Sequence, residues 1–252
     1  MCLRWNWKTG ESKNVKTIDN YHLATWEKLG KQLIWGQLDF VHGMKVLDFG
    51  SGTGVTANYF SEENEVIAIE PSEEMIRDGE KEILQTGRFT QLVGGLDVLK
   101  TMETESFDLI LCHNVLEYAD RREEIVREFY RLLKPGGRLS VVKHNRAGRV
   151  MQMAVLLNNF AHAHELLDGE NCTASKFGAI RYYEDNDIQK WCPEFKCCSV
   201  RGIRTFWDLQ QNQEIQTDLQ WQEEMLKLER RVADLEEFKA VAFFHHLILE
   251  KR

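Results

Sequence analysis

The chain has 252 residues and a formal net charge of −8, from 32 basic and 40 acidic side chains. Its 43% hydrophobic and 29% charged residues are typical of a globular protein and exclude a disordered or collagen-like chain. No segment approaches the ~20 consecutive apolar residues of a transmembrane helix, and the N-terminus MCLRWNWKTGESK lacks the apolar run of a signal peptide. We therefore expect a cytoplasmic protein without a membrane partner. The acidic balance argues against general affinity for nucleic acid but allows a local basic patch.

The six cysteines indicate neither a metal site nor a disulfide framework. No C-x-x-C pair occurs, and Cys192, Cys197 and Cys198 lack the paired spacing of zinc ligands. Free thiols are the usual state of cysteines in a reducing cytosol. We therefore expect free thiols and no bound metal.

Residues 44–144 alternate short apolar runs with helical patterns. The expected strands are 45–49, 65–69, 89–93, 107–111 and 138–142, and the expected helices are 53–61, 72–86 and 121–133. Ser72 is the expected N-cap of the second helix, and Pro135 with two following glycines ends the third. Such alternation indicates βαβ units with right-handed crossovers and a buried parallel sheet.

The pattern changes after residue 144. We expect helices at 147–167 and 185–192, a strand at 199–206, a long helix at 208–237 and a final strand at 243–250. Apolar residues in the long helix recur at alternating spacings of four and three, which predicts an amphipathic helix packed on the body. Residues 145–198 and 207–241 are thus predicted to be helical insertions, serving as a substrate lid and a cover.

A glycine-rich turn follows the first expected strand, within Val46–Gly54. Its spacing is G-x-G-x-G at Gly50, Gly52 and Gly54, whereas the dinucleotide fingerprint is G-x-G-x-x-G. Asp48 precedes the first glycine and would repel a pyrophosphate, but it would suit a ligand with an ammonium group. The turn therefore disfavours an NAD-dependent oxidoreductase. A generic strand-to-helix turn is the plain alternative.

Three acids lie at the carboxyl ends of three successive expected strands: Asp48, Glu70 and Asp97. The carboxyl ends of parallel strands meet at one edge of the sheet, so we expect these acids to lie near one another. Glu70 has the position that binds ribose hydroxyls in doubly wound sheets, and Asp97 could contact an adenine amino group. A single carboxylate here could be an ordinary solvated loop residue. Acids at the carboxyl ends of three successive strands instead favour a ligand that contains a nucleoside.

These segments resemble the class I S-adenosylmethionine-dependent methyltransferases. The matching segments are VLDFGSGTG at 46–54, IEPS at 69–72, LDV at 96–98, FDLILCHNVLEY at 107–118 and LLKPGGRL at 132–139. The resemblance implies an α/β fold with a Rossmann-like, doubly wound sheet of seven strands, mostly parallel with an antiparallel last strand. Residues 1–252 would form a single methyltransferase domain, with 44–144 as its cofactor-binding core.

The resemblance also implies S-adenosylmethionine as cofactor. Its expected binding residues are Asp48, Gly50, Ser51, Gly52, Gly54, Glu70, Pro71, Leu96, Asp97 and His113. In the family the glycine turn contacts the methionine moiety, with Asp48 near its ammonium, and Glu70 binds the ribose diol. Pro71 would pack on the adenine, and Leu96 and Asp97 would hold its edge.

A narrower resemblance is to the bacterial tRNA 5-carboxymethoxyuridine methyltransferase family. It rests on residues 34–39, 113–118, 145–160 and 202–208. That family methylates the carboxylate of a modified wobble uridine, which implies tRNA as partner. An arginine of its N-terminal helix falls on Gly30 here, with Lys31 adjacent. A small-molecule methyltransferase with a helical lid and a non-catalytic S-adenosylmethionine-binding regulator remain alternatives, and the oligomeric state is open.

Three residues are candidates for catalysis in such an enzyme: His113, Tyr118 and Arg204. A carboxylate acceptor is ionised at pH 7 and needs no general base, whereas an acceptor of higher pKa would use His113 or Tyr118. Arg204, in the strand expected at 199–206, would orient an anionic substrate through its planar guanidinium.

Basic residues follow two of the expected strands. Lys143, Arg146 and Arg149 come after one strand, and Arg201 and Arg204 lie in another. By position they could border the mouth of the cleft and meet phosphates. The acidic helix after them should then face away from nucleic acid.

Overall fold

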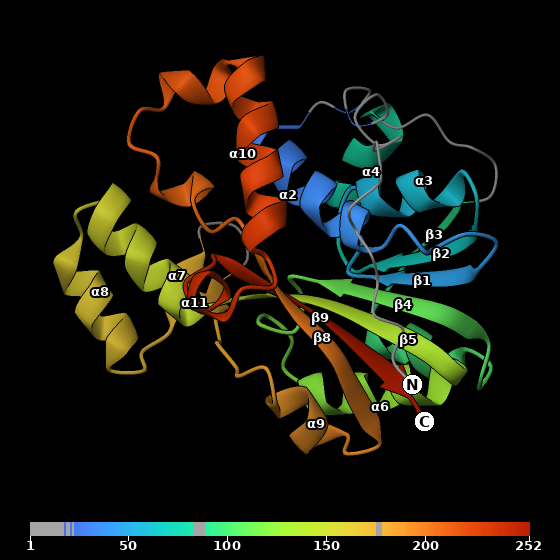
Figure 1. Cartoon of the computed structure of the whole chain (residues 1–252). Coiled ribbons are helices and arrows are strands. Elements are labelled where there is room, and N and C mark those ends of the chain that lie inside the picture. The colour runs from blue at the N-terminus through green and yellow to red at the C-terminus, as the bar shows by residue number, and fades with distance from the viewer. Residues whose placement is uncertain (1–17, 19–20, 22, 83–88, 175–177) are drawn as a thin grey trace.

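The structure is a computed structural model that describes residues 18, 21, 23–82, 89–174 and 178–252. A seven-stranded sheet runs through it in the order β3-β2-β1-β4-β5-β9-β8 (Figure 1). Its strands are β1 Lys45–Phe49, β2 Glu65–Glu70, β3 Phe89–Val93, β4 Phe107–His113, β5 Leu133–His144, β8 Phe195–Ile203 and β9 Phe244–Lys251. A separate hairpin joins β6 Cys172–Ala174 to β7 Gly178–Ile180.

The directions of the strands confirm the predicted Rossmann-like sheet. The first five strands pair in parallel, and β9 is antiparallel to both β5 and β8. The chain moves outward from β1 to β2 and β3, then returns to place β4 on the other side of β1. Doubly wound sheets bind ligands where the strand order reverses, which here is at the carboxyl ends of β1 and β4.

Helices cover both faces of the sheet. They are α2 Thr25–Gln37, α3 Val55–Ser61, α4 Glu73–Glu82, α5 Leu96–Thr101, α6 Arg122–Leu132, α7 Arg146–Met151, α8 Phe160–Leu167, α9 Asp187–Trp191, α10 Leu219–Val232 and α11 Glu236–Lys239. Alternate residues of the strands pack into two separate hydrophobic cores, one on each face of the sheet. This explains why the strand sequences are nearly continuous apolar runs. One core includes α2 and α3, and the other includes α5, α6 and α9. In the described part of the chain, no helix is long and apolar enough to cross a membrane.

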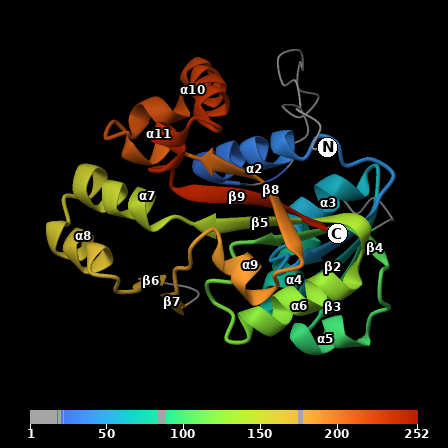
Figure 2. The ribbon, with the colours of Figure 1, turned by 60° about the horizontal axis from the view of Figure 1, so that its bottom comes forward.

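The helix predicted at 147–167 is wrong as a single element. A π-helical turn at Gln152–Leu156 follows α7, and Asn158 then adopts a φ of +51°, which breaks the helix. The Asn159 side chain accepts the His162 N–H and caps α8 as a new helix. Figure 2 shows α7, α8 and the hairpin as an arm extending from the end of β5.

The helix predicted at 208–237 is also wrong in its extent. Short 3-10 turns occupy Trp207–Leu209 and Glu214–Thr217, and Asp218 starts α10 by accepting the Trp221 N–H at 2.7 Å. The apolar side of α10 nevertheless packs on the body, beside α2, as predicted. The strand expected at 199–206 instead spans Phe195–Ile203, because Arg204 turns out of it with a φ of +61°.

Candidate functional site

The glycine turn between β1 and α3 lies at the carboxyl end of β1, where the strand order reverses. Gly50, Gly52 and Gly54 have φ values of +74°, +59° and +82°, which favour glycine. The Gly50 and Ser51 N–H groups donate to the Ile69 carbonyl at 2.8 and 3.1 Å, which ties the turn to β2. A Cβ on Gly50 would lie 2.3 Å from Val115 Cγ2. The turn therefore needs glycine for both conformation and space.

Glu70 ends β2 with its carboxylate turned toward this turn. Its Oε2 accepts the Gly52 N–H at 2.8 Å, and its Oε1 accepts the Ser72 N–H at 2.9 Å. A carboxylate oxygen can accept more than one hydrogen bond, so each can still receive a hydroxyl donor. The side chain is thus pre-oriented in a manner that fits the ribose role expected for it.

Gln91 on β3 is a residue that the sequence reasoning missed. Its amide Nε2 donates to Ser51 Oγ and to the Gly52 carbonyl, both at 3.0 Å. These bonds join a third strand to the glycine turn. Only the place of Gln91 inside an expected strand could have signalled this.

Asp48 lies buried behind the turn, with 3% of its surface exposed. Its Oδ2 has no hydrogen-bond partner among the described residues. Burial raises the pKa of its carboxyl to about 7, Lys31 opposes this shift and Glu70 adds to it. An unpartnered carboxylate oxygen at this depth fits an incoming ammonium group.

Lys31 on α2 supplies the opposite charge. Its Nζ donates to Thr56 Oγ1 at 3.0 Å and lies 5.8 Å from the centre of the Trp35 ring. Burial lowers the pKa of this ammonium group, and Asp48 acts in the opposite direction. A buried acid and a buried base at one turn suit the ammonium and carboxylate of an amino-acid moiety. The sequence had marked Lys31 only as the neighbour of Gly30.

The residues expected around an adenine lie on neighbouring loops. The Gly94 N–H donates to the Glu70 carbonyl at 3.1 Å, which brings the loop after β3 beside the end of β2. Asp97 is exposed in the first turn of α5, and its Oδ1 accepts the Gly95 N–H at 3.0 Å. Pro71 is exposed and Leu96 half-buried. Their contacts with an adenine remain predictions.

His113 is the last residue of β4, beside the glycine turn's strand. Its Nε2 lies 2.9 Å from Ser140 Oγ. Burial, together with His246 and Lys31, holds the pKa of its imidazole well below the ordinary value, so the ring is neutral. Tyr118 lies in the following loop, where its Oη is 3.5 Å from His144 Nε2. The structure thus directs Tyr118 toward the end of β5.

A cationic and aromatic group of side chains surrounds His144 at the carboxyl end of β5. We call it the His144 cluster, and it consists of His144, Arg149, Tyr182, Arg204, Phe243 and Phe244. The His144 ring lies 4.8 Å from Phe244 and 5.7 Å from Phe243, and the Arg204 guanidinium lies 5.0 Å from the Phe243 ring. Burial and the nearby cations Arg149, Arg204 and Lys143 lower the pKa of His144 to about 3. Burial and these cations therefore keep the His144 ring neutral.

Several buried polar atoms in and beside this cluster lack a hydrogen-bond partner among the described residues. They are His144 Nδ1, Arg149 Nε, Thr205 Oγ1 and Glu117 Oε2. Buried polar atoms are rarely left unpaired, and their concentration here indicates a place for a polar ligand. The sequence reasoning missed His144, although it follows an expected strand in the same way as His113.

Arg204 is held more tightly than the sequence predicted. Its guanidinium makes two hydrogen bonds to Asp208, one of them Nε to Oδ2 at 2.7 Å, and only 6% of the residue is exposed. Glu229 on α10 accepts the N–H groups of the next three residues, which fixes the turn. The Arg204 side chain also crosses Gly30, where an added Cβ would lie 3.6 Å from its Cδ. Arg204 therefore lies between the N-terminal helix and the His144 cluster.

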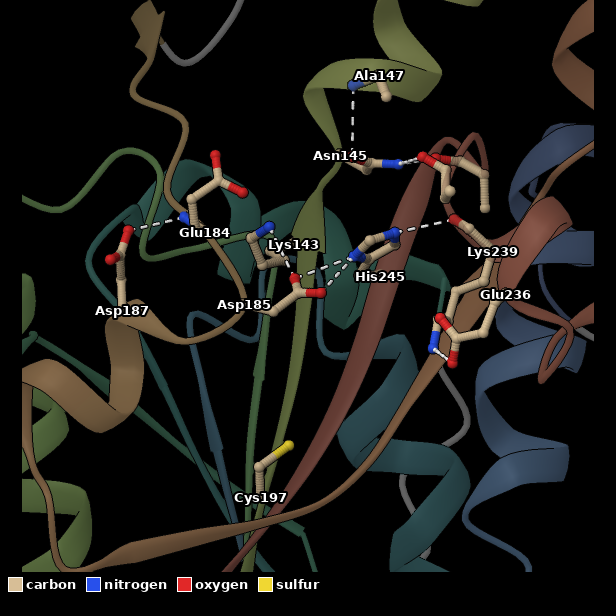
Figure 3. A network of polar contacts seen from close by, with 12 residues as sticks. Lys143, Asn145, Ala147, Glu184, Asp185, Asp187, Cys197, Glu236, Lys239 and His245 are labelled. Carbon is tan, nitrogen blue, oxygen red and sulfur yellow. Dashed lines mark hydrogen bonds and ion pairs between the residues drawn. The ribbon is translucent and has the colours of Figure 1, made fainter.

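The predicted basic cleft mouth is not what the structure shows. Lys143 is buried and pairs with Asp185 at 3.1 Å, and His245 Nδ1 lies 2.9 Å from the same carboxylate. Figure 3 shows these side chains converging from β5, β9 and the segment before α9. Arg146 donates to two backbone carbonyls of the arm, and Arg201 pairs with Asp234 at 2.9 Å. Lys143 and Arg201 therefore tie the insertion and the cover to the sheet, and Arg146 ties parts of the arm to each other.

The described residues contain no group of three or more His, Cys, Asp and Glu side chains that could hold a metal ion. The cysteines whose side chains are described are free thiols: Cys112, Cys192, Cys197 and Cys198. Cys2 lies outside the described residues. The site is thus built from backbone amides, carboxylates, imidazoles and guanidinium groups.

Comparisons with known proteins agree with this geometry. Residues 47–141 match a family model described as a methyltransferase domain. A tRNA 5-carboxymethoxyuridine methyltransferase of Escherichia coli O157:H7 is 26% identical over 92% of both chains. A ubiquinone biosynthesis O-methyltransferase of Idiomarina loihiensis is 27% identical over 58% of both chains. A solved Burkholderia thailandensis 1,6-didemethyltoxoflavin-N1-methyltransferase with bound S-adenosylhomocysteine is 14% identical, with a TM-score of 0.52 over 94% of this chain and 86% of that one.

Proposed function

Because this chain is an S-adenosylmethionine-dependent methyltransferase, we propose that it transfers the methyl group to a carboxylate. The proposed acceptor is the carboxymethoxy group of a modified wobble uridine in tRNA. The observation that carries the proposal is the His144 cluster, where guanidinium groups and aromatic rings meet at the end of β5. A planar base bearing a carboxylate has the matching chemistry.

The cofactor would be held by the residues around the glycine turn. Asp48 would accept hydrogen bonds from its ammonium, Lys31 would face its carboxylate, and Glu70 would accept the ribose hydroxyls. When bound, S-adenosylmethionine supplies an electrophilic methyl group on a sulfonium. The unpartnered Asp48 Oδ2 is the feature that fits this cofactor most directly, because an ammonium group would satisfy it.

The acceptor chemistry follows from the protonation states of the site. A carboxylate is ionised at neutral pH, so the protein needs only to hold it in line with the methyl group, which can supply ~7–11 kcal/mol of the barrier. The lowered pKa values of His113 and His144 make both rings weak bases. They therefore suit an acceptor that has no proton to lose, and Tyr118 would position His144.

The share of the chain that the sequence similarity covers favours the tRNA substrate. The match to the tRNA enzyme covers 92% of this chain, whereas the ubiquinone O-methyltransferase match covers 58%. The longer match must include most of the insertions that build the acceptor side. In this proposal the arm at 145–198 is a lid over the acceptor, and residues 207–241 are a cover.

A small-molecule acceptor is the second candidate. It is favoured by the pairing of Lys143 with Asp185 and of Arg201 with Asp234, and by the bonds of Arg146 to backbone carbonyls, which leave these bases fewer donors for phosphates. Incubation with methyl-labelled cofactor and either bulk tRNA or a pool of small acids distinguishes the two. Label that is retained with tRNA and released by nuclease supports the tRNA acceptor. Label found only in the small acids supports the second candidate.

A further inference from the structure

Four side chains form a chain of hydrogen bonds that begins at His113, at the end of β4, and ends at Gln37 on α2. His113 Nε2 lies 2.9 Å from Ser140 Oγ, and the same oxygen lies 2.8 Å from His246 Nε2. His246 Nδ1 lies 2.7 Å from Gln37 Oε1. The four residues come from β4, β5, β9 and α2. Ser140 is fully buried and His246 is 1% exposed, so water does not compete for these bonds.

The direction of the chain follows from the donors and acceptors. Gln37 Oε1 can only accept, so His246 Nδ1 must carry the proton. Because the His246 ring is neutral, its Nε2 has a lone pair and accepts the Ser140 hydroxyl. The Ser140 oxygen is then left to accept a hydrogen bond, and His113 Nε2 must donate it. His113 Nδ1 consequently has the lone pair.

We propose that Ser140, His246 and Gln37 are positioning residues that hold His113 as the neutral tautomer protonated on Nε2, so that His113 acts only as a hydrogen-bond acceptor toward ligands. Among the described residues, Nδ1 has no hydrogen-bond partner. The proposal concerns the methyltransferase site itself and does not depend on which acceptor is methylated.

The charges around the chain keep both rings neutral. Lys31 on α2 and His246 on β9 act on His113, and Arg201 on β8 acts on His246. All of these, together with burial, lower the pKa values of the two imidazoles. A second proton on His246 would go to Nε2, which would then donate and reverse its hydrogen bond with Ser140. A second proton on His113 would go to Nδ1 and remove the lone pair that faces a ligand.

The tautomer of His113 determines which ligand groups can bind beside it. A lone pair on Nδ1 accepts a hydroxyl or ammonium N–H and repels a carboxylate. His113 therefore fits the donor groups of the cofactor, and a carboxylate acceptor would have to bind on the side of the His144 cluster. This division gives the two histidines at the ends of β4 and β5 different roles.

The tautomer can be read directly by nitrogen NMR of histidine-labelled protein without any ligand. We expect His113 to show an unprotonated Nδ1 and a protonated Nε2, and His246 the opposite pattern. His113→Gln and His246→Gln identify the signals. A protonated Nδ1 on His113 in the unaltered protein would overturn the proposal, because the chain would then run in the reverse direction.

Variants of Ser140 and Gln37 test whether the hydrogen-bond chain determines the tautomer of His113. Ser140→Ala should mix the two His113 tautomers and raise the dissociation constant of S-adenosylhomocysteine about 2- to 12-fold, the value of one hydrogen bond. Gln37→Glu keeps an acceptor and should preserve the His113 signals, whereas Gln37→Met should not. Ser61→Ala removes another fully buried hydroxyl, which bonds to the Asn58 carbonyl, and is the matched control. If Ser140→Ala folds but leaves the His113 signals unchanged, the chain does not position His113.

Discussion

The buried carboxylate of Asp48 should lower the stability of the ligand-free protein but strengthen cofactor binding, so substitution of Asp48 gives a quantitative test. Burial raises the pKa of this carboxyl from 3.8 to about 7. A group whose pKa is raised on folding stabilises the protein at low pH and loses that contribution as the pH rises through 7. At 1.36 kcal/mol per pKa unit, the cost of the ionised carboxyl at pH 8 is up to about 4 kcal/mol.

Asp48→Asn removes this cost and also removes the proposed partner of the cofactor ammonium. The free energy of unfolding of the ligand-free variant should therefore exceed that of the unaltered protein at pH 8, and the difference should vanish near pH 4. Chemical denaturation across this pH range measures it. Asp168→Asn, at an exposed acid, changes the net charge equally and is the control.

Ionisation of Asp48 should also affect cofactor binding. It destabilises the ligand-free protein, but it should strengthen the binding of the cofactor ammonium. With a pKa of about 7, roughly a tenth of Asp48 is ionised at pH 6 and roughly three quarters at pH 7.5. Calorimetric titration with S-adenosylhomocysteine should then give about 8-fold tighter binding at pH 7.5, and Asp48→Asn should abolish this pH dependence while weakening binding. A variant that binds as tightly as the unaltered protein, with the same pH dependence, would refute the role assigned to Asp48.

Three further predictions follow from single contacts. Asp185→Asn should lower the free energy of unfolding by about 3 kcal/mol at pH 7, since it leaves Lys143 buried without its partner, and the loss should shrink as the pH falls toward the Asp185 pKa of about 2; thermal unfolding measures both. Gly50→Ala should abolish measurable cofactor binding through its contact with Val115, and adding Val115→Ala should restore part of it; equal binding by the two variants would contradict the steric argument. Arg204→Ala should raise the KM for the acceptor roughly 10-fold or more, the value of a charge-assisted hydrogen bond, whereas Arg121→Ala, at the residue before α6, should not; an unchanged KM would remove Arg204 from the acceptor site.

The sequence predicted the sheet well because buried parallel strands carry their own signal. Strands at 45–49 and 89–93 appear with the predicted bounds. β1 is buried along most of its length, as expected for a central parallel strand, whereas β3 lies at the edge of the sheet and is partly exposed. The glycine turn was equally readable, because its positive φ values at Gly50, Gly52 and Gly54 require glycine. Both features depend on neighbours close in the sequence.

The insertions and the acceptor side were less predictable, because competing local signals and distant partners decide them. Apolar spacing continues through Asn159 and Asp218, but their side chains cap new helices and divide the predicted ones. The pairing of Lys143 with Asp185, and the place of Arg204 over Gly30, join segments far apart in the chain. Such contacts have no periodic signature, so basic residues expected at a cleft mouth proved to be internal ties.

Methylation of a carboxylate, as proposed, gives a methyl ester, and the lability of this ester in alkali distinguishes it from other methylated products. Bulk tRNA methylated with labelled cofactor can be treated with mild alkali, which hydrolyses a methyl ester and leaves methyl groups on nitrogen, carbon or ether oxygen intact. We expect the label to leave the tRNA as methanol. Label that stays on the nucleoside after alkali would contradict it.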